Sequence, residues 1–396
     1  MRFAYVTISL FFIGFLIHSA SAQPFKYELK SIKDSRTQQW KTIKGEWRNA
    51  NRADRFLHGL LNESNTTALS VAIVNRDRIV FLREMGNINK KSEKTVDKQT
   101  VFRAASLSKP VFAYLVMKLF DKDLLGLDEP LYKYLDKPLA EYPKYQDMKS
   151  DDRYKLLTAR LLLSHQSGFP NWRFMNKDRR LDFKFTPGEK FKYSGEGYGL
   201  LQFVLEQITK KDLNQLAKEN IFEPLGMMNS SFIWERRFDN NFAVNLETGL
   251  RQLIEKTKQT PKAAASLLTN THDYAKFLLA IMNGRGLMSK TLTQMLRPQV
   301  AITSKSLHAP QGSDPEIQKR IKLSWSLGWG RFHCSAGDVI FHVGYEEGCD
   351  NYAVIFLDHN IGLVLQSVIG TMEGIAPRIT KELMGDVYSP FKWLNY

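Results

Sequence analysis

The chain has 396 residues and a formal net charge of +15, from 56 basic and 41 acidic side chains. This length suits one large domain or two interleaved ones. Basic residues are spread among acidic ones, a pattern that favours a solvated surface or weak attraction to an anionic envelope over a nucleic-acid groove. Because no recognition-helix or RNA-binding signature is present, we expect no nucleic-acid partner.

The first 22 residues have the pattern of a secretory signal peptide. Arg2 precedes an apolar run over residues 3–17, and Ser19-Ala20-Ser21-Ala22 supplies the small residues of a cleavage site. We expect cleavage after Ala22 and a periplasmic or secreted protein; an uncleaved N-terminal anchor is the alternative. No later segment is apolar enough to span a membrane, so we expect no integral span after cleavage. Residues 23–48 are predicted to be a polar, irregular lead-in.

A helix and a hairpin are predicted to follow. Apolar residues recur with a helical period over residues 50–61, and β-rich segments at 68–74 and 78–84 flank a turn. A further helix is expected over the apolar run 111–120. From about residue 124 to 320 the pattern is mostly helix and loop, with helices expected at 156–164, 198–208, 213–221, 272–282 and 290–296.

After residue 321 the apolar period changes to two. Strands are expected at 325–332, 338–343, 351–358 and 362–368, followed by a helix at 375–384. Strands at both ends with helices between them predict an α+β fold. We expect residues 49–120 and 321–396 to form a mainly antiparallel sheet flanked by helices, and residues 121–320 to form an inserted, mostly helical domain.

The segment Phe102–Pro110 combines a hydroxyl and an amine at a predicted helix start. Ser106 and Lys109 are three residues apart and would share one face of a helix. Since proline is tolerated only in the first turn, Pro110 implies that the helix begins near Ser106, where unpaired N–H groups favour negative charge. The spacing alone is weak evidence. A second copy, Ser389–Lys392, lies in the C-terminal tail, where no following helix is expected.

Three other motifs accompany this pair: Leu162–Gly168, Tyr193-Ser194-Gly195 before a predicted helix, and Phe341–Tyr345 on a predicted strand. With Pro187-Gly188, residues 224–227 and residues 328–330, they resemble the serine β-lactamase and penicillin-binding-protein superfamily. The branch most similar contains class C β-lactamases, family VIII esterases and related D-amino-acid peptidases. The likeness covers roughly residues 50–385 and implies a β-lactamase/transpeptidase-like fold.

The resemblance implies a role for each matched residue. Ser106 would attack an acyl carbon, with Lys109 as its base if part of the lysine population is neutral. Tyr193 matches a tyrosine that shares the proton relay, as base or as acid toward the leaving group. The backbone N–H groups of Ser106 and Tyr345 would form the oxyanion hole. The implied substrate-binding residues are Ser194, Gly195, His342 and Gly344, the last by letting the strand edge come close.

Two departures from the family pattern point away from antibiotic hydrolysis. The second motif usually ends in an asparagine that binds the substrate amide, and here it ends in Gly195. The third motif has His342 where lactamases usually carry lysine, a replacement shared with many esterase- and peptidase-like members. A histidine is a weaker, pH-dependent anchor for a substrate carboxylate.

We therefore expect an exported serine hydrolase that cleaves an ester or amide, such as a D-amino-acid peptide, through an acyl-enzyme on Ser106. The alternatives are a class C type β-lactamase and, outside the enzymes, a non-catalytic acyl-binding or sensor protein. The partner expected is a small-molecule or peptide acyl substrate.

No cofactor is expected, and the histidines lack metal-ligand spacing, so we expect no metal site. His165 is predicted to be a structural loop residue. Cys334 and Cys349 lie in segments predicted to be neighbouring strands. They could form a disulfide or remain buried thiols.

Overall fold

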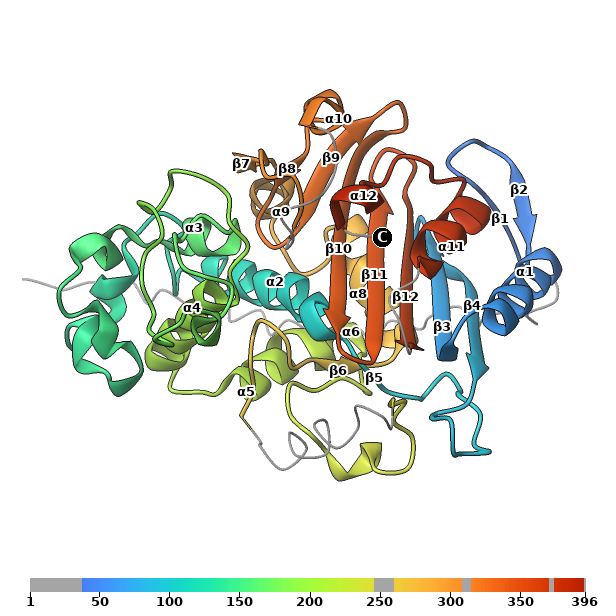
Figure 1. The fold of residues 1–396 in the computed structure, drawn as a ribbon, viewed down its shortest axis with the longest axis horizontal. Coiled ribbons are helices and arrows are strands. Elements are labelled where there is room, and N and C mark those ends of the chain that lie inside the picture. The colour runs from blue at the N-terminus through green and yellow to red at the C-terminus, as the bar shows by residue number, and fades with distance from the viewer. Residues whose placement is uncertain (1–37, 246–259, 308–314, 370–373, 395–396) are drawn as a thin grey trace, which may run out of the picture. The chain divides into compact units, whose positions relative to one another are not determined.

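The computed structural model describes residues 38–245, 260–307, 315–369 and 374–394 (Figure 1). The predicted signal peptide lies outside these residues. Within them, no helix combines the length and apolar character needed to cross a membrane.

Eight strands of the described chain form one antiparallel sheet, in the order β4-β3-β12-β11-β10-β9-β8-β7 (Figure 1). Their bounds are β3 Thr66–Asn75, β4 Arg78–Gly86, β7 Val300–Ala301, β8 Ser324–Trp325, β9 Gly330–Cys334, β10 Gly337–Glu346, β11 Cys349–Phe356 and β12 Ile361–Ile369. β12 pairs with β3, so the sheet joins early and late parts of the chain. This confirms the predicted α+β class with a mainly antiparallel sheet built from both termini.

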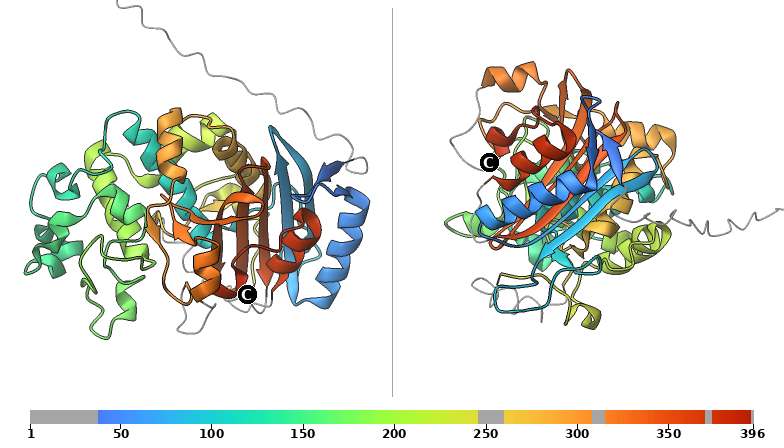
Figure 2. Two further views of the ribbon diagram at one scale, coloured as in Figure 1. Left: turned by 90° about the horizontal axis from the view of Figure 1, so that it is seen from above. Right: turned by 90° about the vertical axis from the view of Figure 1, so that its right-hand side faces the viewer.

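Helices cover both faces of the sheet. α1 (Ala50–Glu63) and α11 (Ile375–Met384) lie together on one face, and α8 (Thr271–Met282) lies on the other, as does α2 (Ser108–Phe120) (Figure 2). Alternation along β3 explains this arrangement, because successive side chains point to opposite faces. Val71 and Ile73 pack in the core with α1 and α11, while Ala72 and Val74 pack in the core with α2 and α8.

The described residues between 121 and 320, which leave out 246–259 and 308–314, form mainly short helices, turns and loops. Their α-helices are α3 Ala159–Leu163, α4 Gly195–Thr209, α5 Leu213–Ala217, α6 Glu223–Leu225, α8, α9 Ser289–Leu296 and α10 Pro315–Arg320. A two-stranded pair, β5 (Phe102–Arg103) and β6 (Leu268–Thr269), ties this part to the segment before α2. The division into a sheet domain and an inserted helical domain stays a prediction.

Several helix bounds differ from the predicted ones. A π-helical turn over Lys218–Phe222 ends α5 early, and a 3-10 turn over Asp152–Leu156 replaces the expected start of α3. The predicted strand 325–332 is in fact two strands, β8 and β9. Gly328 interrupts it with φ +89°, at a point where a Cβ would overlap the side chain of Ala113 in α2. The close approach of α2 therefore breaks the strand.

Two terminal segments are more ordered than predicted. The end of the lead-in forms a hairpin of β1 (Gln39–Lys41) and β2 (Trp47–Asn49), because Trp40 is buried and its Nε1 donates to the carbonyl of Leu383 at 2.8 Å. The second Ser-x-x-Lys copy, Ser389–Lys392, runs into a short helix, α12 (Phe391–Leu394), where no helix was expected. Its serine hydroxyl donates to the carboxylate of Asp386 at 2.6 Å.

The two cysteines are free thiols. They lie on β9 and β11, which flank β10 on opposite sides. The prediction that the two cysteines lie on neighbouring strands was therefore wrong. Cys334 pairs with Gly337 and Cys349 with Glu346, at opposite ends of β10. At about 3.3 Å per strand residue, the ends are roughly 30 Å apart, which excludes a disulfide.

Candidate active site

Ser106 lies in a 3-10 turn, Ala105–Leu107, that leads directly into α2. The α-helix itself begins at Ser108, two residues after Ser106, so it starts near Ser106 and has Pro110 in its first turn, as predicted. Ala105 has φ +46°, a left-handed conformation that is strained for a residue with a Cβ. The hydroxyl of Ser108 donates to the Ala105 carbonyl at 2.6 Å and accepts from the Leu267 N–H at 3.0 Å. These bonds hold the turn in its strained form.

The amine of Lys109 reaches back to Ser106. Its Nζ donates to Ser106 Oγ at 2.9 Å and to the carbonyl oxygen of Ala264 at 2.8 Å. The side chain is fully buried, and burial lowers the pKa of Lys109 to about 7. Near neutral pH a large fraction of this lysine is therefore uncharged and able to accept a proton from Ser106.

Tyr193 completes the group from the extended segment before α4. Lys109 Nζ lies 4.7 Å from the centroid of the Tyr193 ring. Burial raises the pKa of the Tyr193 hydroxyl, and a side-chain hydrogen bond with Ser106 lowers it in part. The structure thus brings the three predicted side chains together, with Tyr193 as a neutral phenol that has a proton to donate.

An aromatic cluster holds Tyr193 in place. The His165 ring lies 4.2 Å from the Tyr193 ring, and the Trp325 ring meets it edge-on at 5.8 Å. His165 is fully buried, and its Nδ1 accepts from the Ser194 N–H at 3.1 Å, so the neutral ring carries its proton on Nε2. These contacts agree with the predicted structural role of His165.

The strand motif Phe341–Tyr345 lies against the turn that carries Ser106. Residues 342–346 of β10 extend beyond β9, whose register covers Gly337–Phe341. A Cβ at Gly344 would overlap the carbonyl oxygen of Ala104 and lie 3.1 Å from the Leu107 nitrogen, so only glycine allows this approach.

The Gly344–Tyr345 peptide has a defined orientation. Asn351 Nδ2, from β11, donates to the Gly344 carbonyl at 2.7 Å. In a trans peptide unit the C=O and the following N–H point in opposite directions. The N–H of Tyr345 therefore points away from β11, toward the edge that β9 leaves open.

His342 and Ser194 are both buried. His342 Nδ1 lies 2.7 Å from the Val343 carbonyl, and its ring lies 6.2 Å from that of Tyr193. Ser194 caps α4: its Oγ accepts from the Gly197 N–H at 3.0 Å and donates to the Pro170 carbonyl at 2.8 Å. A direct substrate contact for either residue stays a prediction.

Three contacting groups were missed from the sequence. The Ala264 carbonyl carries no sequence signal, since any residue has one. Asn351 had a signal, because a fully buried amide within an apolar strand is uncommon and demands a partner. Trp172, which lies over Gly195, is in a loop without periodicity. Among the described residues, no cluster of three or more His, Cys, Asp or Glu side chains is placed to hold a metal ion.

Comparison with known proteins finds similarity to β-lactamase-related proteins. The family model described as Beta-lactamase matches residues 53–372. Penicillin-binding protein 4* of Bacillus subtilis is 24% identical over 315 residues, covering 73% of this chain and 65% of that protein. Esterase EstB of Burkholderia gladioli is 24% identical over 210 residues, covering 46% and 52%. The D-alanyl-D-alanine-carboxypeptidase/endopeptidase AmpH of Escherichia coli is 25% identical over 199 residues, covering 45% and 49%. Each match spans less than two thirds of the relative's own length.

Solved structures share the fold. The octameric penicillin-binding protein homologue from Pyrococcus abyssi aligns with a TM-score of 0.66 and 18% identity, over 88% of this chain and 80% of that chain. The beta-lactamase/D-alanine carboxypeptidase from Yersinia pestis aligns with a TM-score of 0.64 and 18% identity, over 85% and 99%.

Proposed function

We propose, from the premise that this chain belongs to the beta-lactamase family, that it is a serine hydrolase which cleaves an ester or amide through an acyl-enzyme on Ser106. The observation that carries the proposal is the 2.9 Å hydrogen bond between Ser106 Oγ and a buried lysine whose pKa is lowered to about 7. A serine hydroxyl needs such a base to act as a nucleophile. A protein that only bound acyl groups would have no need to bury an amine beside that hydroxyl.

The acylation step uses all three side chains. As Ser106 Oγ bonds to the acyl carbon, its proton passes to Lys109 Nζ. The developing oxyanion is stabilised by the N–H groups of Ser106 and Tyr345, each worth about 10²–10³ in rate. When the bond to the leaving group breaks, the Tyr193 hydroxyl gives its proton to the departing oxygen or nitrogen and regains one from Lys109.

Deacylation runs through the same groups in reverse. A water oxygen attacks the acyl carbon while its proton moves into the Tyr193 and Lys109 relay. The bond to Ser106 Oγ then breaks, and the relay returns a proton to that oxygen. The acid product leaves, and the three side chains regain their starting protonation states.

Esters and D-amino-acid peptides are the proposed substrate classes. The relatives include an esterase and a D-alanyl-D-alanine carboxypeptidase/endopeptidase. Gly195 has no side-chain amide to bind the side chain of a lactam. His342 is fully buried, which makes it a poor anchor for the carboxylate of a lactam. β-Lactam hydrolysis is the second candidate, favoured by the shared fold. From the leader-like sequence of residues 1–22, we propose that the enzyme acts in the periplasm or outside the cell.

Labelling with a fluorophosphonate tests the nucleophile. The reagent should add one adduct, which peptide mass spectrometry places on Ser106, and Ser106→Ala should remove it. Ser389→Ala, which alters the second Ser-x-x-Lys copy, is the matched control and should retain the adduct. An adduct elsewhere, or none, would contradict the hydrolase proposal. A panel of short-chain nitrophenyl esters, D-alanyl-D-alanine peptides and nitrocefin then ranks the substrate classes. If nitrocefin is much the best substrate, the second candidate replaces the first.

A further inference from the structure

The place that a longer side chain at residue 195 would take is filled by an indole ring. A Cβ built on Gly195 would lie 2.7 Å from Cη2 of Trp172, 2.8 Å from Cζ3 and 2.9 Å from Cζ2. No residue larger than glycine fits there unless Trp172 moves. Residue 195 therefore has no polar side chain, and the aromatic ring of Trp172 occupies the space that such a side chain would take.

This surface is on the side of the chain that carries Tyr193. Ser194, the residue between Tyr193 and Gly195, is extended, with φ −144° and ψ 113°. Side chains on either side of an extended residue point the same way. The Tyr193 ring lies beside Lys109 Nζ. A Cβ on Gly195, and the Trp172 ring that occupies its place, are therefore on the side of the chain that faces the candidate catalytic groups.

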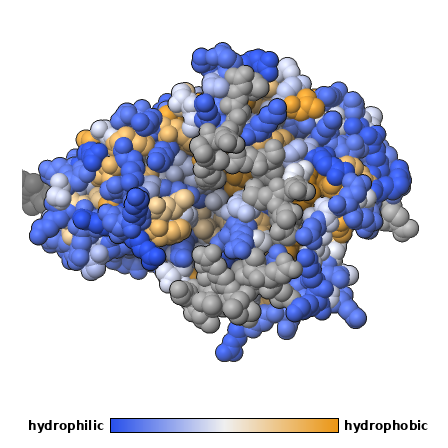
Figure 3. Space-filling model, viewed as in Figure 1, coloured by the Kyte–Doolittle hydropathy of each residue, from blue (hydrophilic) through white to orange (hydrophobic). Residues whose placement is uncertain are grey.

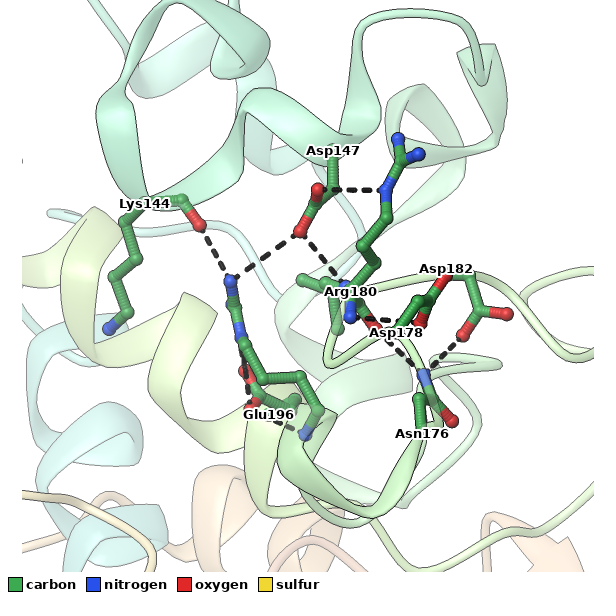
Figure 4. A network of polar contacts seen from close by, with 9 residues as sticks. Lys144, Asp147, Asn176, Asp178, Arg180, Asp182 and Glu196 are labelled. Atoms are coloured by element: carbon green, nitrogen blue, oxygen red, sulfur yellow. Dashed lines mark hydrogen bonds and ion pairs between the residues drawn. The ribbon is translucent and has the colours of Figure 1, made fainter.

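Bonds on both sides of Trp172 fix the loop to the start of α4. The carbonyl of Asn171 accepts from the N–H groups of Gly195 and Glu196, each at 3.0 Å. The Arg173 guanidinium pairs with Glu196 at 2.9 Å, and the Arg173 N–H donates to the same carboxylate at 2.9 Å. Figure 4 shows Glu196 within a polar network that includes Lys144, Asp147 and Arg180. Trp172 is therefore held in position before any ligand arrives.

The aromatic surface continues outward. The rings of Trp172 and Phe174 stack at 6.1 Å with an interplanar angle of 10°, and Phe174 is 63% exposed. The face of the molecule in Figure 3 is mostly hydrophilic. Trp172 is half-buried and stacks on the exposed Phe174 ring. An ordered aromatic pair with one exposed member is a surface suited to another flat apolar group.

Building on the proposed function, we propose that Trp172 and Phe174 form a substrate subsite for a flat apolar group, such as a phenyl ring, on the acyl side of the scissile bond. This contact replaces the amide contact that an asparagine at residue 195 would make. The enzyme would then prefer arylacyl substrates over substrates with a small acyl group.

The test uses two thioesters that share a non-aromatic leaving group, ethanethiol, and differ in the acyl group: S-ethyl ethanethioate (acetyl) and S-ethyl 2-phenylethanethioate (phenylacetyl). The full-length protein hydrolyses each of them, and the release of ethanethiol is measured. Trp172→Ala should lower the ratio of kcat/KM for phenylacetyl over acetyl about tenfold, and Trp172→Phe should restore most of it. Trp47→Ala removes a tryptophan that is 63% exposed on β2 and should leave the ratio unchanged. An equal loss on both thioesters, or no change in the ratio, would overturn the subsite.

A second pair of variants guards against misfolding of Trp172→Ala. Gly195→Asn should reduce activity in the wild-type background, where the new side chain meets the indole, and should reduce it less when combined with Trp172→Ala. If the two losses simply add, the indole does not occupy this space. Fluorophosphonate labelling of Ser106 in each variant separates the proposals: normal labelling with an unchanged ratio refutes the subsite alone, and absent labelling in the wild type refutes the hydrolase.

Discussion

Replacing Lys109 with methionine should change the pH dependence of stability in a defined direction. The pKa of Lys109 falls from 10.5 to about 7 in the folded protein because its side chain is fully buried. Between those values the unfolded chain binds a proton that the folded protein does not. Stability must therefore rise with pH over this window, and Lys109→Met, which has no such proton, loses this contribution.

The size follows from the two pKa values. At 1.36 kcal/mol per pKa unit, the lysine should contribute about 3 kcal/mol more to the wild type at pH 9.5 than at pH 7. Other titrating groups are common to both proteins and cancel in the difference. The constant cost of leaving the Ala264 carbonyl unpaired in the variant cancels as well.

Urea unfolding of both proteins at pH 7 and pH 9.5 measures this difference. The free energy of unfolding of the wild type, minus that of Lys109→Met, should increase by about 3 kcal/mol between the two pH values. Lys319→Met, which removes a lysine with a 75% exposed side chain, should follow the wild type at both. A wild-type minus Lys109→Met difference that stays constant with pH would show that Lys109 is protonated at neutral pH and is no base.

The remaining predictions concern the reaction and the strand beside it. In the wild type, kcat/KM should rise about tenfold per pH unit below about pH 7 and level off above it, as Lys109 becomes neutral; a profile flat from pH 5 to 8 would contradict this. Tyr193→Phe should lower kcat by about 10²–10⁴ with a thermal midpoint close to that of the wild type, and retained turnover would remove Tyr193 from the relay. Gly344→Ala should abolish turnover because the new Cβ overlaps the Ala104 carbonyl. The control Gly59→Ala, whose Cβ would have no atom within 4 Å, should keep turnover and stabilise α1 by roughly 0.5–1 kcal/mol. If both variants keep full turnover, the close contact at Gly344 is refuted.

Local patterns in the sequence predict much of this fold. The helix α11 was predicted with its observed bounds, and β3, β4, β11 and β12 to within about two residues. What failed depends on contacts distant in the chain. Gly328 breaks a predicted strand because α2 passes against it, and the β1–β2 hairpin is anchored by a hydrogen bond between Trp40 and Leu383. No window of neighbouring residues contains either contact.

The candidate site also contains residues that local sequence predicts and residues that depend on distant contacts. The Ser106 and Lys109 pair follows from spacing, because its two members are one turn apart. Tyr193 was found only through resemblance to a family, since its place beside Lys109 depends on the packing of α4. Trp172 was missed because loop residues have no period, and the meaning of Gly195 changes only when the ring above it is seen.

The pairing of β12 with β3 sets an order of events during folding. Residues 361–369 must find residues 66–75, so nearly three hundred residues of chain lie between the partners. The entropy of closing so long a loop is lost before the strand contacts form, so folding is slow. During synthesis, the edge of β3 that pairs with β12 stays exposed until β12 has been made. Ribosome-bound chains that end before residue 361 should therefore aggregate or recruit holding chaperones.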